Sequence, residues 1–222
     1  MARTLLANTG YGELSLLSLS SADIKGIDAI VQDAIEMFDE DTLTIAMPST
    51  RVDAFNVHLA ELVERGRRSG MTFAPEAGTE RMREVINKGV SEAETLHAVG
   101  LAFARGWQTV KLYFMIGLPT ETMDDINAII DLGRRVKTEG KLSGKGGEVN
   151  VSVSSFVPKA HTPFQWDRLC PPDEIQRKQD LLKSAIRARD VTLKFRNPVL
   201  SYLEGIIGRG DRRLGAVILA AY

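Results

Sequence analysis

Cysteine is almost absent from the sequence, since Cys170 is the only one among 222 residues. A single thiol cannot form an internal disulfide. It also cannot alone provide the thiolates that cysteine-based zinc or iron–sulfur sites require. We therefore expect no complete metal-ligand set within these residues.

An excess of charge of either sign is also lacking, because 28 basic and 29 acidic residues leave a formal net charge of −1. Binding to nucleic-acid phosphates or to anionic lipid favours a basic balance, so neither partner is expected. No apolar run approaches the roughly 18 residues of a membrane-spanning helix, and the first residues turn polar too soon for a signal peptide. We expect a cytoplasmic protein.

What the sequence does contain is a repeated alternation of short apolar runs and amphipathic stretches. The runs are rich in residues that suit strands, and several are too uniformly apolar for a strand with one wet face. They cover residues 13–19, 42–47, 71–74, 109–116 and 149–157. This rhythm predicts an α/β fold with a parallel sheet covered by helices. Periodicity alone leaves an open doubly wound sheet and a barrel as alternatives.

Helix signals lie between these runs. Apolar residues recur every three or four positions in residues 27–38 and 126–136, as on one face of a helix. Two capping boxes predict further helix starts and pair Ser91 with Glu94 and Thr122 with Asp125. The pair Pro171–Pro172 predicts a helix near residues 175–187, and residues 191–195 form a possible extra strand.

In both candidate folds, ligands gather at the carboxyl ends of the strands. The loops that follow the expected strands cover residues 18–23, 48–53, 74–81, 117–122 and 158–164. Glycine, proline, serine and threonine in such loops have an ordinary role in ending strands and starting helices. Candidate functional residues are nevertheless sought there.

Two segments have a more specific pattern, residues 71–89 (MTFAPEAGTERMREVINKG) and residues 110–122 (VKLYFMIGLPTET). Together with residues 156–166 and 201–214, they closely resemble the radical S-adenosylmethionine (SAM) superfamily. Within it they look like the group of Fe–S oxidoreductases often built with an N-terminal cobalamin-binding domain. The resemblance covers nearly the whole chain.

The resemblance implies a partial (β/α)6 TIM-like barrel that binds a four-iron, four-sulfur cluster and SAM. Enzymes of the family cleave SAM reductively to a 5′-deoxyadenosyl radical, and three cysteines in a CxxxCxxC loop hold their cluster. That loop is missing here, so we expect a fragment without the first barrel strand. Residues 1–169 would hold strands two to six, and residues 170–222 a C-terminal helical extension.

The resemblance also places SAM contacts on the earlier loops. Ser20, Ser21 and Asp23 would meet the SAM amino group, whereas Ser49 and Arg51 would face SAM or substrate. Judged from the residues alone, Ser21 or Asp23 could instead cap the next helix. A structural ion pair is the corresponding alternative for Arg51.

On the later loops, Glu76 would contact the ribose or methionine part of SAM, and Lys88 its carboxylate. The alternatives are a carboxylate at a helix start and a surface lysine. Glu121 is expected to stabilise the start of the following helix. Adenine would lie against the residues after two later strands, which are Ile116, Gly117, Leu118, Pro119, Val157, Pro158 and His161.

Without cluster ligands the chain alone is expected to be inactive, and no catalytic residue is assigned to it. Cobalamin could act in the intact protein through an upstream domain. A non-catalytic module that binds SAM or another nucleotide, or a scaffold, is the alternative function. The substrate is not identified by the sequence. An incomplete barrel exposes a sheet edge, so self-association is expected.

Overall fold

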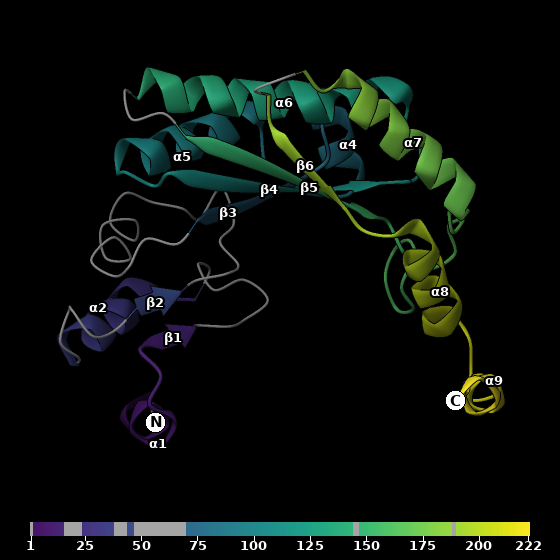
Figure 1. Ribbon diagram of the computed structural model, residues 1–222, viewed down its shortest axis with the longest axis horizontal. Helices are drawn as coiled ribbons and strands as arrows, with labels where there is room; N and C mark the ends of the chain where they lie inside the picture. Colours follow the sequence, from purple (N-terminus) through teal and green to yellow (C-terminus); the bar gives the residue numbers. More distant parts are fainter. Residues whose placement is uncertain (1, 16–23, 38–43, 47–69, 144–146, 188–189) are drawn as a thin grey trace.

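The computed structural model describes residues 2–15, 24–37, 44–46, 70–143, 147–187 and 190–222. Within these ranges the chain forms two parallel sheets and eight helices (Figure 1). The predicted α/β class is confirmed. No ladder joins the two sheets in the described ranges, so the partial barrel stays a hypothesis.

The N-terminal part forms the smaller sheet. Helix α1 (Ala2–Thr9) leads into β1 (Glu13–Ser15), and β2 (Thr44–Ala46) follows α2 (Ile27–Met37). Strands β1 and β2 pair in parallel, with Leu14 opposite Ile45. Helix α2 confirms the helix that the apolar spacing of residues 27–38 predicts.

The larger sheet has the order β3-β4-β5-β6 and is parallel throughout. Its strands are β3 (Met71–Glu76), β4 (Thr109–Ile116), β5 (Glu148–Ser155) and β6 (Thr192–Phe195). The central pair β4 and β5 keeps one register from Thr109 opposite Glu148 to Ile116 opposite Ser155. Strand β6 confirms the extra strand expected in residues 191–195.

Helices α5 (Glu92–Ala104), α6 (Met123–Leu142) and α7 (Pro172–Ala185) cover one face of this sheet (Figure 1). The short α4 (Glu80–Val85) follows β3. Both predicted capping boxes are present, at the starts of α5 and α6. Because Pro172 opens α7, that helix start is also confirmed.

The two faces of the sheet differ in chemistry. Alternate residues of β4 and β5, among them Leu112 and Val151, are buried in one core with the helices. The intervening residues, such as Lys111, Tyr113 and Ser152, are half-buried or exposed on the opposite side. Parallel sheets are usually apolar on both faces because both are covered. This polar open face is therefore the first structural sign of a site.

The segment after residue 170 takes part in the same core, since Leu182 of α7 and Val191 before β6 are buried within it. Helices α8 (Pro198–Arg209) and α9 (Leu214–Ala221) extend beyond β6, and α9 buries no residue. The division at residue 170 stays a prediction. In the described part of the chain, every helix is too short or too polar to span a membrane.

Candidate functional site

The residues predicted on the first two loops lie outside the described ranges. They are Ser20, Ser21, Asp23, Ser49 and Arg51. Their assignment to SAM stays a prediction. The remaining predicted residues lie at the ends of β3, β4 and β5 or in the connections that follow these strands.

At the end of β3, Glu76 and Lys88 form an ion pair with 3.5 Å between the carboxylate Oε1 and the ammonium Nζ. Their side chains are 28% and 23% exposed, so both remain reachable from solvent. Burial raises the pKa of the Glu76 carboxyl, and the charge of Lys88 opposes that rise. Glu76 also has a backbone φ of 70°, an uncommon conformation for a residue with a side chain. The two polar groups predicted to meet SAM thus stand beside each other.

Buried Arg83 organises the loop that carries this ion pair. Its Nε donates to the carbonyl of Val90 at 2.8 Å, and its Nη1 donates to the carbonyl of Ala77 at 2.9 Å. The amide of Lys88 in turn donates to the carbonyl of Arg83. Sequence reasoning missed Arg83, because its hydrogen bonds go to backbone carbonyls, which leave no side-chain pattern.

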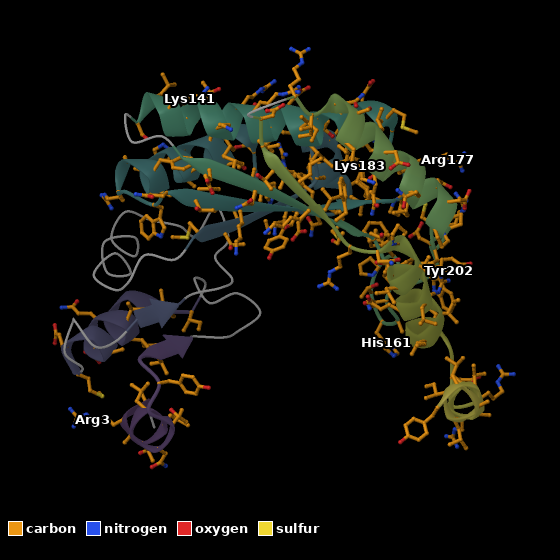
Figure 2. The ribbon with its side chains drawn as sticks, in the orientation of Figure 1. Arg3, Lys141, His161, Arg177, Lys183 and Tyr202 are labelled. Carbon is orange, nitrogen blue, oxygen red and sulfur yellow. The ribbon has the colours of Figure 1, made fainter. Side chains whose placement is uncertain are left out.

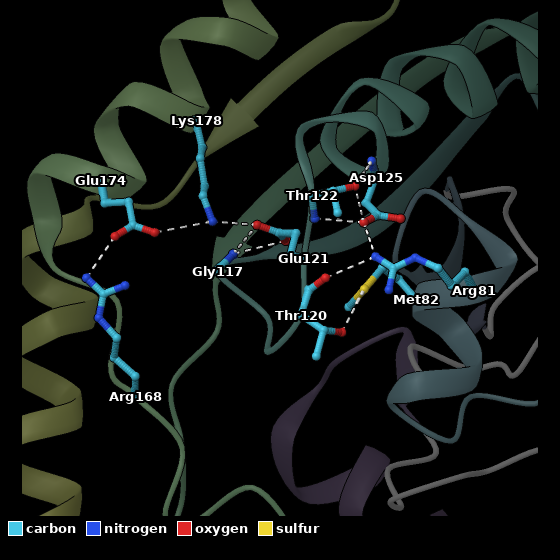
Figure 3. A network of polar contacts seen from close by, with 10 residues as sticks. All are labelled: Arg81, Met82, Gly117, Thr120, Glu121, Thr122, Asp125, Arg168, Glu174 and Lys178. Atoms are coloured by element: carbon cyan, nitrogen blue, oxygen red, sulfur yellow. Dashed lines mark hydrogen bonds and ion pairs between the residues drawn. The ribbon is translucent and has the colours of Figure 1, made fainter.

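The loop after β4 is held by Glu121 (Figure 3). Its carboxylate accepts from the backbone amide of Gly117 at 2.9 Å and from the ammonium of Lys178 at 2.7 Å. The side chains of Glu121 and Lys178 are only 4% and 9% exposed. The expectation that Glu121 stabilises the start of α6 is therefore replaced by a different finding: it fixes the β4 loop to α7.

Gly117 itself meets two constraints in this loop. Its φ of +85° lies in the region that favours glycine, and an added Cβ would stand 2.8 Å from Cδ1 of Ile175. The neighbouring Ile116 side chain is fully buried in the helix-side core. Only its backbone lies near the open face, so any adenine contact by Ile116 would be a backbone contact.

Asp125, at the start of α6, joins the loops after β3 and β4 (Figure 3). Its carboxylate accepts from the hydroxyls of Thr79 and Thr122 and pairs with Arg81. These donors outweigh the opposing effect of burial and lower the pKa of Asp125 to about 2. The network fixes the two loops relative to each other.

The loop after β5 contains three predicted residues. Val157 is half-buried, Pro158 is buried and His161 is exposed, with a φ of 63°. Lys159 pairs with Glu204 of α8, and Phe164 stacks edge-on against Phe156 with 5.9 Å between ring centroids. His161 lies on this loop, close to α8 in Figure 2. Val157 lines a cavity.

That cavity, of about 590 Å³, opens on the polar face of the sheet at the carboxyl ends of β4, β5 and β6. Its apolar lining includes Met115, Phe156 and Val157. Next to it, Ala77, Met82 and Leu118 form a small buried cluster against which Met115 and Phe156 pack. The predicted residue Leu118 thus supports the cavity wall, whereas Pro119 lines a smaller neighbouring cavity of about 280 Å³ with Gly117.

The polar lining of the larger cavity includes Ser152 and Ser155. The Ser155 hydroxyl oxygen is buried and has no hydrogen-bond partner in the described structure. Ser155 stands opposite Ile116 in the β4–β5 ladder, so its side chain lies on the helix-side face, whereas Ser152 lies on the polar face. Sequence reasoning missed Ser152, although the alternation VNVSVS in residues 149–154 signals a strand with one polar face.

The cavity suits part of SAM. Its volume falls within the range of about 300–1,000 Å³ found for small-molecule sites. Its apolar wall fits an adenine ring, and the Ser152 hydroxyl on its polar face fits a ribose. The residues present therefore match the nucleoside half of SAM.

The described residues do not provide ligands for an iron–sulfur cluster. Cys170 is buried, and burial together with the Glu174 carboxylate raises the pKa of its thiol to about 11. Such a thiol is a poor source of thiolate. Among the described residues, no three histidine, cysteine or acidic side chains gather in a way that could hold a metal ion.

Comparison of sequences gives a family and two relatives. A sequence model of the radical SAM superfamily matches residues 1–133. The uncharacterized protein MJ0966 of Methanocaldococcus jannaschii is 31% identical over 202 residues, which are 91% of this chain and 42% of that protein. The uncharacterized methyltransferase PH0819 of Pyrococcus horikoshii is 30% identical over 88 residues, 40% of this chain and 19% of that protein. The chain thus spans less than half the length of either relative.

Comparison of structures concerns the fold alone. The crystal structure of SuiB from Streptococcus suis superposes with a TM-score of 0.58 at 12% sequence identity. The superposition covers 86% of this chain and 41% of SuiB. Since the family match extends over more than half of the sequence, the chain belongs to the radical SAM superfamily.

Proposed function

We propose that this chain is the part of a radical SAM enzyme that binds the nucleoside half of SAM, and that residues outside these 222 supply the cluster thiolates. The observation that carries the proposal is the cavity on the polar face of the sheet, at the carboxyl ends of the strands. When bound, the cluster and SAM supply reductive cleavage of SAM to a 5′-deoxyadenosyl radical, the chemistry of the superfamily.

The described residues have positioning roles in this proposal. Met115 and Val157 form the apolar wall for adenine, and the Ser152 hydroxyl is available to the ribose. The Glu76–Lys88 pair offers a carboxylate for the SAM amino group and an ammonium for its carboxylate. Glu121 keeps the Gly117 loop in place.

Binding of SAM by the 222-residue chain, measured by equilibrium dialysis, tests the proposal. We expect weak, saturable binding, because no cluster chelates the methionine end. Ser152→Phe, which fills the cavity, should weaken binding at least tenfold. Thr192→Phe, on the same face but outside the cavity lining, should leave it unchanged. Absence of saturable binding would reject the proposal, whereas tight binding would favour the non-catalytic binding module.

The iron content of the chain after anaerobic reconstitution is a second test. We expect no stoichiometric cluster, given one buried cysteine. A content of about four irons per chain with formation of 5′-deoxyadenosine would overturn this expectation. The coding sequence upstream tests the fragment hypothesis, because an in-frame cysteine-rich strand is required there.

The use of cobalamin is the finer part of the proposal and rests on the resemblance to the cobalamin-associated group. It requires an upstream domain that holds this cofactor. Loading of the full-length protein with cobalamin, followed by its visible absorption spectrum, would test it. If the full-length protein retains no cobalamin after gel filtration, the proposed use of cobalamin is rejected and the SAM proposal is unaffected.

A further inference from the structure

The larger cavity is strongly cationic in a chain that has no overall positive charge. Its lining carries three basic residues, Lys159, Lys194 and Arg196, and one acidic residue, Glu204. The formal balance of the cavity is therefore +2, against −1 for the whole chain. The cavity lining is thus more positive than the chain as a whole.

Two of these cations have no counter-charge among the described residues. Lys159 is paired with Glu204. Within the described ranges, the ammonium of Lys194 and the guanidinium of Arg196 contact no carboxylate, and both side chains are exposed. An unpaired lysine and arginine on one wall of a cavity can donate several charge-assisted hydrogen bonds to an oxyanion.

The backbone holds these two residues in a fixed relation. Lys194 lies in β6 opposite Ser152, and Arg196 follows two positions later, so both side chains point to the same face. Residues two apart along a strand are about 6.6 Å apart, which suits two donors on one anionic group. The amide of Arg196 donates to Val153, and its carbonyl accepts from Gln179 of α7 at 2.9 Å.

The cavity also has two chemically distinct sides. Met115, Phe156 and Val157 form the apolar side, next to the strand-end cluster. The cations lie on the β6 side, across β5 from Tyr113 and Met115 of β4. The apolar side is the part assigned above to adenine, so the cationic side is left for a second molecule.

We propose that Lys194 and Arg196 bind an oxyanion, a phosphate or carboxylate group, of the substrate. This inference rests on the proposed function, because it places the substrate beside the cofactor in the same cavity. It assigns the substrate to the class of phosphorylated or carboxylated small molecules. The same chemistry could be met by the carboxylate of SAM, and the experiment must separate these two sources.

The probe is inorganic phosphate, titrated into the 222-residue chain against sodium chloride of equal ionic strength, with the melting temperature as readout. We expect saturable stabilisation of the wild-type chain. The double variant Lys194→Met/Arg196→Met should lose at least tenfold in phosphate affinity. Lys111→Met/Lys141→Met removes two cations outside the cavity lining and should bind phosphate as the wild type does. Both variants alter partially or fully exposed side chains, so melting without phosphate should change little.

Equal loss of phosphate binding in the two double variants, or stabilisation without saturation, would overturn the inference. Dialysis with SAM separates the two sources. If the oxyanion belongs to the substrate, phosphate and SAM bind together and the Lys194→Met/Arg196→Met variant keeps its SAM affinity. Competition between phosphate and SAM would overturn the assignment to the substrate. Phosphate binding without any SAM binding would count against the proposed function alone.

Discussion

The ionised carboxylate of Asp125 stabilises the folded chain at the junction of the loops after β3 and β4. Its pKa falls from 3.8 to about 2 because Thr79, Thr122 and Arg81 stabilise the carboxylate against the cost of burial. A carboxyl whose pKa is lower in the folded state than in the unfolded state stabilises the fold at a pH above its unfolded-state pKa. This stabilisation is lost as the pH falls through the folded-state pKa. The stabilisation by ionised Asp125 is therefore lost between about pH 4 and about pH 2.

We predict that Asp125→Asn lowers the free energy of unfolding by about 2 kcal/mol at pH 7, the equivalent of this shift in pKa. The difference from wild type should shrink as pH falls from 4 toward 2. Urea unfolding followed by circular dichroism at both ends of this range measures it. Asp124→Asn, one position earlier in the same helical turn and exposed, is the control and should have little effect.

Cys170 provides a second prediction at the scale of one residue. With its pKa raised from 9.0 to about 11, the thiolate fraction at pH 8 falls roughly 100-fold. Burial of the side chain further limits access. We expect Ellman's reagent to react with the native chain far more slowly than with the chain unfolded in guanidinium. Equal rates in the two states would show that the thiol is accessible.

At the scale of elements, helix α6 passes very close to the loop after β3. A Cβ added at Gly78 would stand 2.6 Å from the amide nitrogen of Ile129, in the backbone of α6. A backbone cannot yield as a flexible side chain does, so the loop or the helix must move. The same loop carries Glu76, and any movement would displace the ion pair with Lys88.

We therefore predict that Gly78→Ala destabilises the chain by about 1–3 kcal/mol, the usual cost of overpacking. It should also weaken SAM binding through displacement of the β3 loop. Thermal unfolding and dialysis measure the two effects. Gly89→Ala lies in the same connection with open space around it and should leave both unchanged. A Gly78→Ala chain as stable as wild type would contradict the close approach.

The elements that the sequence predicts well are those with local signals. Capping boxes at Ser91 and Thr122 involve residues three apart, and the apolar runs of β3 and β4 are continuous. The role of Glu121 in fixing the loop after β4 to α7 has no local signal, because its partner Lys178 lies 57 residues away. The cavity could not be predicted from the sequence alone. The alternating serines of β5 give that strand one polar side, but this side forms a cavity wall only together with the neighbouring strands in register.

At the scale of the whole molecule, the larger sheet has two edge strands in the described part of the chain. Among the described strands, β3 pairs only with β4, and β6 only with β5. Unpaired strand edges favour pairing with another chain. Exposed apolar side chains on α8 and α9, such as Leu200 and Leu219, add a second surface of this kind.

We predict concentration-dependent self-association of the 222-residue chain, measured by sedimentation velocity. Thr72→Lys on β3 should shift the population toward monomer if the β3 edge is the contact, because charges at a sheet edge oppose pairing. Thr192→Lys makes the same change at the β6 edge and serves as its comparison. A chain that stays monomeric at all concentrations would contradict the prediction.

The described helices cover one face of the larger sheet, and this has a consequence for how such a protein can evolve. Successive residues along β4 and along β5 point to opposite faces of the sheet. Leu112 and Val151 pack in the core, whereas Tyr113 and Ser152, the next residue in each strand, line the cavity. Substitutions on the cavity side leave core packing intact and cost little stability. A new substrate can therefore be acquired by exchanging every second residue of a strand, while the residues between them preserve the fold.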